Sequence, residues 1–172
     1  MMSNYIRVFA QGHAYFITIV TYHREPLLCQ HIDLFRSALL HSKQFFDYTI
    51  DAIAVLPDHI HLIILPKNVH EYPKIIQSIK HYFSRHFPYT MMRTPVQTKR
   101  REAGIWQRRY YEHTIRNEYE LQKYRDYIHY NPVKHGLCTS ALDWKYSSFR
   151  KFVDIGVYAQ DWYSLGDEIE IE

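Results

Sequence analysis

Two histidines separated by one residue, His59 and His61, lie inside a strongly apolar run that extends from Val55 to Pro66. Strand side chains alternate between the faces of a sheet, so residues two apart point the same way. If this run is a strand, both imidazoles project from one face, and Ile60, Leu62 and Ile64 share the other. Two neighbouring imidazoles supply two ligands of a metal site. The same spacing also fits two polar residues on a half-exposed strand.

The composition is typical of one globular domain. A chain of 172 residues suits a single domain, and an aromatic content of 16% argues against disorder. Cys29 and Cys138 stand apart without a CxxC motif, as reduced thiols of a cytoplasmic protein do. No apolar run approaches the roughly 20 residues of a membrane span, and no signal peptide is recognisable. We therefore expect one cytoplasmic domain over residues 1–172.

Basic residues exceed acidic residues over most of the chain. The formal net charge is +3, but residues 161–172 contain five acids and no lysine or arginine, so residues 1–160 carry +8. A basic body with a short acidic tail at about 161–172 predicts a polyanionic partner, with nucleic acid first. Ordinary charge for solubility is the alternative interpretation.

The hydrophobic pattern predicts the order β-α-β-β-α-β followed by one more helix. Strands are expected over residues 14–22, 48–56, 59–66 and 106–113, and helices over residues 31–45, 73–87 and 117–131. A polar segment at 89–104 is predicted to be a mobile loop. Asn117 with Glu120 forms a capping signal, and Pro132 is expected to end the last helix. This is an α+β, ferredoxin-like (RRM-like) antiparallel sheet with an added C-terminal helix.

Tyr127 and Asn131 lie four residues apart on that last helix and therefore share a helical face. A tyrosine one turn before an amide oxygen can present a nucleophile beside a third metal ligand. Together, His59, His61 and Asn131 can hold a hard divalent cation, Mg²⁺ or Mn²⁺, that polarises a phosphodiester. Tyr127, placed in line with that phosphate, could then form a phosphotyrosine bond. The alternative is that Tyr127 is one of many core tyrosines and Asn131 a helix C-cap.

Three segments in this order carry a family resemblance: His59-Ile60-His61, the run from Trp106 to Arg116, and the run from Tyr127 to Leu137. They resemble the HUH single-tyrosine transposases, most of all the REP-associated branch, over roughly residues 10–152. The wider family usually has glutamine four residues after the tyrosine, where this chain has Asn131, as in the REP-associated branch.

The resemblance implies a bacterial, nucleoid-associated enzyme with a divalent metal. Its substrate would be single-stranded DNA with a palindromic, REP-like hairpin, cleaved and rejoined through a 5′-phosphotyrosine link at Tyr127. His59, His61 and Asn131 would be the metal ligands. The resemblance favours a monomer over a homodimer that exchanges the tyrosine helix. The segment 144–150 also resembles this branch, and either packs on the sheet or touches the hairpin.

Basic and aromatic residues near the expected site fit a DNA strand, because cations meet phosphates and rings stack on unpaired bases. On a strand, neighbouring residues face opposite ways, so only one of the adjacent arginines at 108 and 109 is expected to meet the substrate. Core packing is the alternative for the aromatic residues. The candidate DNA-binding residues are Arg108, Arg109, Lys80, Arg85, Trp106 and His113.

Three other functions remain open at this point. A non-catalytic nucleic-acid-binding RRM-like domain would have the same fold, but this chain lacks the RRM strand signature and the histidine pair would have no purpose there. A rolling-circle replication initiator or relaxase often uses two tyrosines or a reversed motif order. A metal-dependent hydrolase that uses water would not need Tyr127.

Overall fold

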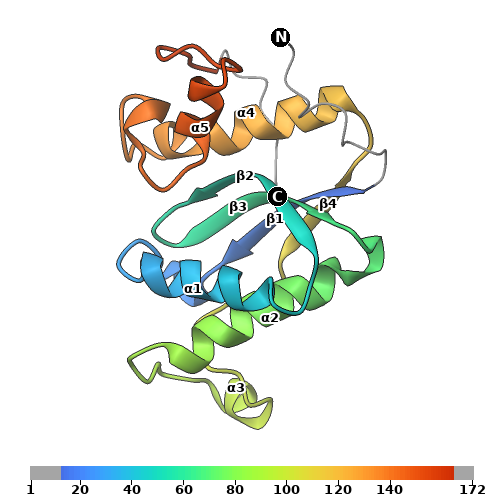
Figure 1. Cartoon of the computed structure of the whole chain (residues 1–172). Coiled ribbons are helices and arrows are strands. Elements are labelled where there is room, and N and C mark those ends of the chain that lie inside the picture. The colour runs from blue at the N-terminus through green and yellow to red at the C-terminus, as the bar shows by residue number, and fades with distance from the viewer. Residues whose placement is uncertain (1–12, 165–172) are drawn as a thin grey trace.

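The computed structural model describes residues 13–164. Four strands form one antiparallel sheet in the order β2-β3-β1-β4, as follows: β1 (Ala14–Val20), β2 (Tyr48–Val55), β3 (His59–Pro66) and β4 (Tyr111–Ile115). Helices α1 (Ile32–Ser42) and α2 (Tyr72–His86) cover one face of the sheet. Helices α4 (Glu118–Lys134) and α5 (Phe149–Asp154) lie on the other, and the short α3 (Pro95–Lys99) lies beyond α2 (Figure 1). The expected class, an antiparallel sheet with helices, is confirmed.

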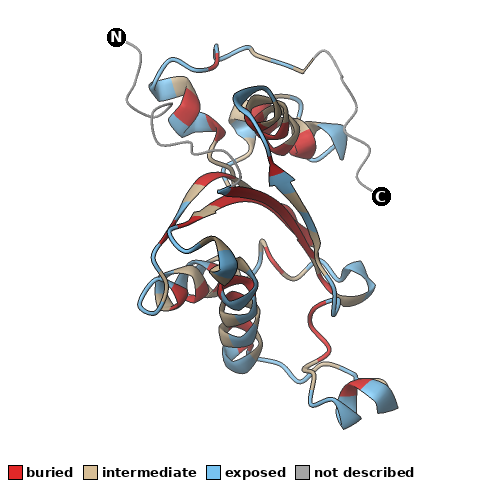
Figure 2. Cartoon of the chain, turned by 90° about the vertical axis from the view of Figure 1, so that its right-hand side faces the viewer, coloured by how far each residue is buried: buried red, intermediate tan, exposed pale blue. Residues whose placement is uncertain are grey.

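The sheet is buried on both faces, as Figure 2 shows for its central strands. Alternate strand residues pack against α1 and α2 in one cluster that includes Ile17, Ile60, Leu62, Ile79 and Phe83. The other residues pack against α4 and α5 in a second cluster that includes Phe16, Ile63, Tyr124, Ile128 and Phe149. Burial of apolar surface on both faces is the main stabilising contribution to this layered arrangement.

The histidine run forms β3, one of the two central strands, with the expected alternation. His61 pairs with Thr18 and His59 pairs with Val20 of β1, so these side chains share the face toward α4. Ile60 lies on the opposite face, in the cluster with α1 and α2. The sheet therefore presents both imidazoles to the helix that carries Tyr127.

The expected strand over 106–113 is wrong in its position, because β4 is Tyr111–Ile115. Trp106 makes only an isolated bridge with Thr21, and the backbone N–H of Gln107 donates to the Val20 carbonyl. The Lys80 ammonium on α2 donates to the carbonyls of Gln107 and Arg108 at 2.9 and 3.3 Å. Those carbonyls therefore bond to a side chain of α2 rather than to the neighbouring strand.

Two further expectations about helices are wrong. Helix α4 does not end at Asn131 but continues through Pro132 to Lys134. Pro132 is buried in the last turn, where the missing N–H removes only one bond of the ladder before the helix ends. The segment 89–104 is not entirely loop, because α3 begins at a capping box in which Thr94 and Gln97 each satisfy the other's backbone N–H.

The segment 144–150 covers the free edge of β2. The Val55 N–H donates to the Tyr146 carbonyl at 2.8 Å, and the Ser148 N–H donates to the Ile53 carbonyl at 2.9 Å. The Trp144 indole also donates to the Val55 carbonyl. Of the two roles expected for this segment, the structure shows packing on the sheet, which blocks pairing of this edge with another chain.

Within residues 13–164, none of the helices is long and apolar enough to cross a membrane. Most of the acidic tail, residues 165–172, lies outside the described residues.

Candidate active site

His59 and His61 lie side by side on β3, with ring centroids 4.8 Å apart. Each ring is oriented through its Nδ1 atom. The Nδ1–H of His59 donates to Asp58 Oδ1 at 2.6 Å, and His61 Nδ1 shares a hydrogen bond of 2.8 Å with the Thr18 hydroxyl. These bonds leave Nε2 of each ring as the atom available to a ligand, the arrangement typical of metal-binding histidines.

Asn131 of α4 completes a three-donor arrangement. Its Oδ1 atom lies 3.3 Å from Nε2 of His59, and its Nδ2 atom is buried without a hydrogen-bond partner in the described part of the chain. A neutral His59 ring that donates its Nδ1–H to Asp58 has its lone pair on Nε2. That lone pair faces Asn131 Oδ1, which is also an acceptor. Two acceptors at this distance suit a bound cation or a proton on Nε2. The residues present therefore fit a metal ion.

Tyr127 lies one helical turn before Asn131, and its ring centroid is 5.1 Å from that of His61. Its ring also packs edge-on against Phe16 at 5.8 Å, which fixes the plane of the phenol. Burial raises the pKa of Tyr127, while the hydrogen bond with Asn131 offsets part of that rise. The phenol is thus protonated at neutral pH and has to lose its proton when it acts as a nucleophile.

Electrostatics around the pair favour uncharged imidazole at His61. Burial lowers the pKa of His61 well below its ordinary value, and the neighbouring charges of His59, His135 and Arg24 lower it further. For Asp58, burial alone would raise the pKa. The hydrogen bonds and charges of His59 and Arg24 outweigh that effect and hold the pKa below its ordinary value. The site thus combines a neutral imidazole, the form that can bind a metal, with an ionised carboxylate that orients the neighbouring ring of His59.

The two histidine side chains on β3 are almost fully buried, since His59 is 4% exposed and His61 is 3% exposed. Tyr127 is half-buried and His135 is exposed, with its ring 5.1 Å from that of His59. These two rings are therefore more exposed than the histidine pair that they contact. His135 was not among the expected site residues, although it follows Asn131 by four residues, the same spacing that links Asn131 to Tyr127.

A metal at this site would have few protein ligands. Among residues 13–164 there is no group of three or more His, Cys, Asp or Glu side chains arranged to hold a metal. Two imidazoles and one amide oxygen would therefore leave open positions for substrate oxygens.

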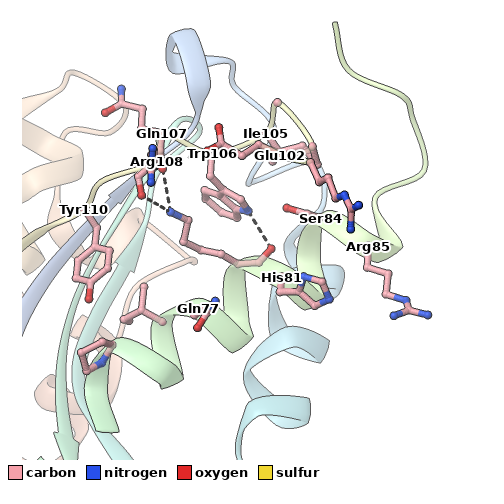
Figure 3. A pocket seen from close by; sticks show the side chains of 16 residues that line it. Gln77, His81, Ser84, Arg85, Glu102, Ile105, Trp106, Gln107, Arg108 and Tyr110 are labelled. Atoms are coloured by element: carbon pink, nitrogen blue, oxygen red, sulfur yellow. Dashed lines mark hydrogen bonds and ion pairs between the residues drawn. The ribbon is translucent and has the colours of Figure 1, made fainter. Parts of the chain in front are cut away.

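Four of the six candidate DNA-binding residues converge on one cavity of about 560 Å³, on the opposite layer of the molecule. We call it the α2 pocket, because α2 forms one wall and residues 101–110 form the other (Figure 3). The four are Lys80, Arg85, Trp106 and Arg108. Trp106 is only 8% exposed and packs on Phe83, so its ring belongs largely to the core, which was the alternative interpretation.

The other two candidates lie elsewhere. Arg109 is exposed and does not line the α2 pocket. His113 lies on β4 and faces α4, where its Nε2 atom is 3.4 Å from Glu120 and its ring packs against Tyr124. The structure therefore does not bring His113 together with the four pocket residues.

Sequence reasoning missed the polar contacts that fasten α4 to β2. Arg125 forms two hydrogen bonds with Asp51, and His129 Nε2 shares a hydrogen bond of 2.8 Å with the Ser148 hydroxyl. Ser148 in turn bonds to the backbone of Ile53 on β2. Asp51 interrupts an otherwise mostly apolar strand, which was the one local signal of a specific partner.

Residues 9–131 match the family model described as IS200-like transposase. The chain belongs to the IS200-like transposase family. A protein of Haemophilus influenzae assigned as a REP-associated tyrosine transposase is 43% identical over 164 residues, covering 94% of this transposase and 93% of the relative. The REP-associated tyrosine transposase of Escherichia coli is 32% identical over 176 aligned positions, covering 98% and 99%.

A solved structure extends the likeness to three dimensions. It is described as a REP-associated tyrosine transposase bound to a REP hairpin, and its TM-score with this transposase is 0.77. The identity is 32%, covering 99% of this transposase and 98% of that chain. The resemblance drawn from the three sequence segments is thus confirmed. Family membership favours the transposase over the RRM-like binder, the replication initiator or relaxase, and the hydrolase.

Proposed function

We propose that this transposase cleaves and rejoins single-stranded DNA beside REP-like hairpins through a 5′-phosphotyrosine intermediate at Tyr127. One observation carries the assignment of residues: Tyr127 and Asn131, on one face of α4, meet His61 and His59 on β3. The substrate follows from the relatives, which are named REP-associated transposases, and from the solved structure described as bound to a REP hairpin.

In the proposed cleavage step, the Tyr127 oxygen attacks a phosphodiester phosphorus. A bond forms between that oxygen and the 5′ phosphate, and the bond from phosphorus to the 3′ oxygen breaks. The 3′ oxygen leaves as a hydroxyl, so the proton lost by tyrosine is balanced. One phosphodiester replaces another in this exchange. Rejoining by a 3′ hydroxyl therefore needs no ATP.

His59, His61 and Asn131 would hold the divalent ion, Mg²⁺ or Mn²⁺. When bound, such an ion polarises the phosphate and stabilises negative charge that develops on its oxygens. Asp58 and Thr18 hold the two rings with Nε2 toward the substrate side. Burial keeps His61 neutral, and Phe16 fixes the tyrosine ring.

We also infer that residues 1–172 form one ferredoxin-like domain that acts as a monomer. The antiparallel strand order β2-β3-β1-β4, with α1 and α2 on one face, supports the ferredoxin-like plan. The tyrosine helix α4 packs on the opposite face of the same sheet, with Tyr127 beside this chain's own histidines. Use of the tyrosine in cis is therefore favoured.

The test is the polarity of the covalent adduct. The transposase is incubated with Mg²⁺ and a single-stranded hairpin that carries a 5′ flank, labelled at either end in separate reactions. After denaturing electrophoresis, the label of the 3′ fragment is expected to migrate with the protein, because its 5′ phosphate is on tyrosine. An adduct to the 5′ fragment, or cleavage without any adduct, would overturn the proposal.

A further inference from the structure

The α2 pocket combines apolar residues with polar and cationic residues in its lining. Its volume of about 560 Å³ is within the range of about 300–1,000 Å³ that small-molecule sites occupy. Ile76, Ile105 and Trp106 are buried and form its floor. The amides of Gln77 and Gln107 are exposed at its rim. An apolar floor with a few hydrogen-bonding groups matches the flat, polar-edged surface of a base.

The charge of the lining is strongly positive. Four of the lining side chains are cationic and one is a carboxylate. Arg85, Arg101 and Arg108 are exposed at the rim, and Arg85 and Arg108 extend from opposite walls (Figure 3). Rim cations of this kind suit the phosphates on either side of a bound nucleoside. The carboxylate, Glu102, would repel a phosphate but can accept hydrogen bonds from the amino group of a base.

Lys80 adds a half-buried positive charge to the lining of the pocket. Its ammonium donates to the carbonyls of Gln107 and Arg108, and burial lowers its pKa, an effect that the charge of Glu102 partly offsets. The same two bonds join α2 to the opposite wall. Gly104 has φ of +75°, and a Cβ there would lie 2.9 Å from the Met92 carbonyl, so the wall depends on a turn that favours glycine. The pocket is therefore largely preformed.

The α2 pocket and the histidine pair lie on opposite faces of the sheet, near the same end of it. His59 pairs with Val20, and the Val20 carbonyl accepts from the backbone N–H of Gln107. Adjacent strands are about 4.8 Å apart, which places the backbone of Gln107 about 10 Å from that of His59. The segment 106–110 forms the outer edge at this end of the sheet. A single strand that passes around that edge can contact both sites.

We propose that the α2 pocket binds one unpaired nucleotide of the substrate strand, with its base on the floor and its phosphates at the arginine rim. This inference rests on the proposed function. It adds a second site on the DNA strand that sets which phosphodiester reaches Tyr127. Arg109 and His113, which do not line the pocket, are not part of this site.

The experiment combines DNA and protein changes. A hairpin with a single-stranded 5′ flank is prepared with an abasic residue at each flank position in turn, and its affinity for the wild-type chain is measured by titration. One position is expected to lose affinity by about ten-fold, since the abasic residue lacks the base that would contact the pocket. Ser84→Phe fills the pocket from α2, so no base can enter it. In this variant the same abasic residue is expected to change the affinity for the hairpin very little.

Lys74→Ala is the matched control, because Lys74 is exposed on α2 and does not line the pocket. It should retain the full abasic effect. Thermal melts check that Ser84→Phe is folded, and Gln77→Trp at an exposed position serves if it is not. Uniform tolerance of abasic residues, or an undiminished abasic effect in both pocket-filling variants, would overturn the inference.

Adduct formation on the unmodified hairpin separates this failure from that of the proposed function. If the adduct forms but filling the pocket does not change the abasic effect, the proposed function stands and the nucleotide site is refuted. Absence of any adduct with the wild-type chain would refute the function.

Discussion

Arg125 on α4 and Asp51 on β2 form a buried ion pair with two N–O distances of 2.6 Å. Their side chains are 8% and 6% exposed. A register shift between Ile50 and Ala52 makes Asp51 the extra residue of a β-bulge, which turns its side chain toward the helix. Arg125 precedes Tyr127 by two residues. The pair therefore links the helix that carries the nucleophile to the sheet that carries the histidines.

Removing one partner should be strongly destabilising. Asp51→Ala leaves the Arg125 guanidinium buried without its carboxylate, and we expect the free energy of unfolding to fall by about 3–5 kcal/mol. Urea denaturation measures this loss. Asp47→Ala is the control, because the Lys67–Asp47 pair is largely exposed, and it should cost less than about 1 kcal/mol. Equal effects of the two substitutions would contradict the role assigned to the buried pair.

His129 should make stability depend on pH. Burial, helped by the charge of Arg125, lowers its pKa from 6.5 to about 3. The unfolded chain therefore binds a proton that the folded chain does not, so stability present above pH 6.5 is lost as pH falls from about 6.5 toward 3. His129→Leu should reduce the slope of the unfolding free energy against pH by up to about 1.4 kcal/mol per pH unit.

The measurement is urea denaturation at several values between pH 7 and pH 4.5. The matched variant His70→Leu replaces an exposed histidine and should keep the wild-type slope. If both variants have the wild-type slope, the buried ring of His129 does not govern this dependence.

Asp58 should control metal affinity without binding the metal itself. Its bond of 2.6 Å to His59 Nδ1 fixes which nitrogen faces the site. Loss of such a partner typically weakens metal binding by about 10- to 100-fold, and we expect this for Asp58→Asn. Titration calorimetry with Mn²⁺ measures the change. Asp47→Asn should bind as the wild type does, and unchanged affinity in Asp58→Asn would argue against the metal site.

DNA binding should depend steeply on salt and on strand form. Residues 1–160 carry a net charge of +8, so counterion release should weaken binding as salt rises. Unpaired bases should add affinity, which favours a hairpin with a single-stranded 5′ flank over a blunt duplex. Titrations of both DNA forms at two salt concentrations test this. Salt-independent binding, or equal affinity for blunt duplex, would speak against a single-strand transposase.

Local patterns predicted the parts of the site that depend on short spacing. The i, i+2 histidines fell on one face of β3, and Tyr127 and Asn131 on one face of α4. The cap of α4 at Asn117 was likewise confirmed. The contacts between distant segments could not be read this way. Asp51 meets Arg125 across 74 residues, through a bulge that no repeat in the sequence indicates.

The capping box of α3 shows a different kind of miss. Thr94 and Gln97 carry a recognisable signal, but the helix is only five residues long and lacks an apolar stripe. Pro132 shows the opposite error, because a proline near a helix end is tolerated when its ring is buried and few hydrogen bonds follow. The strand expected at 106–113 begins only at Tyr111, and the carbonyls of Gln107 and Arg108 before it accept from Lys80, a side chain of another element.

The central claim is that Tyr127 is the nucleophile, and covalent capture of hairpin DNA by single-tyrosine variants tests it most directly. Tyr130 is the matched control, because it lies on the same helix but packs against Trp162. Tyr127→Phe should abolish the adduct while keeping hairpin affinity within about two-fold, since only a hydroxyl is removed. Tyr130→Phe should form the adduct as the wild type does. Persistent adduct in Tyr127→Phe, or its loss in Tyr130→Phe alone, would contradict the account.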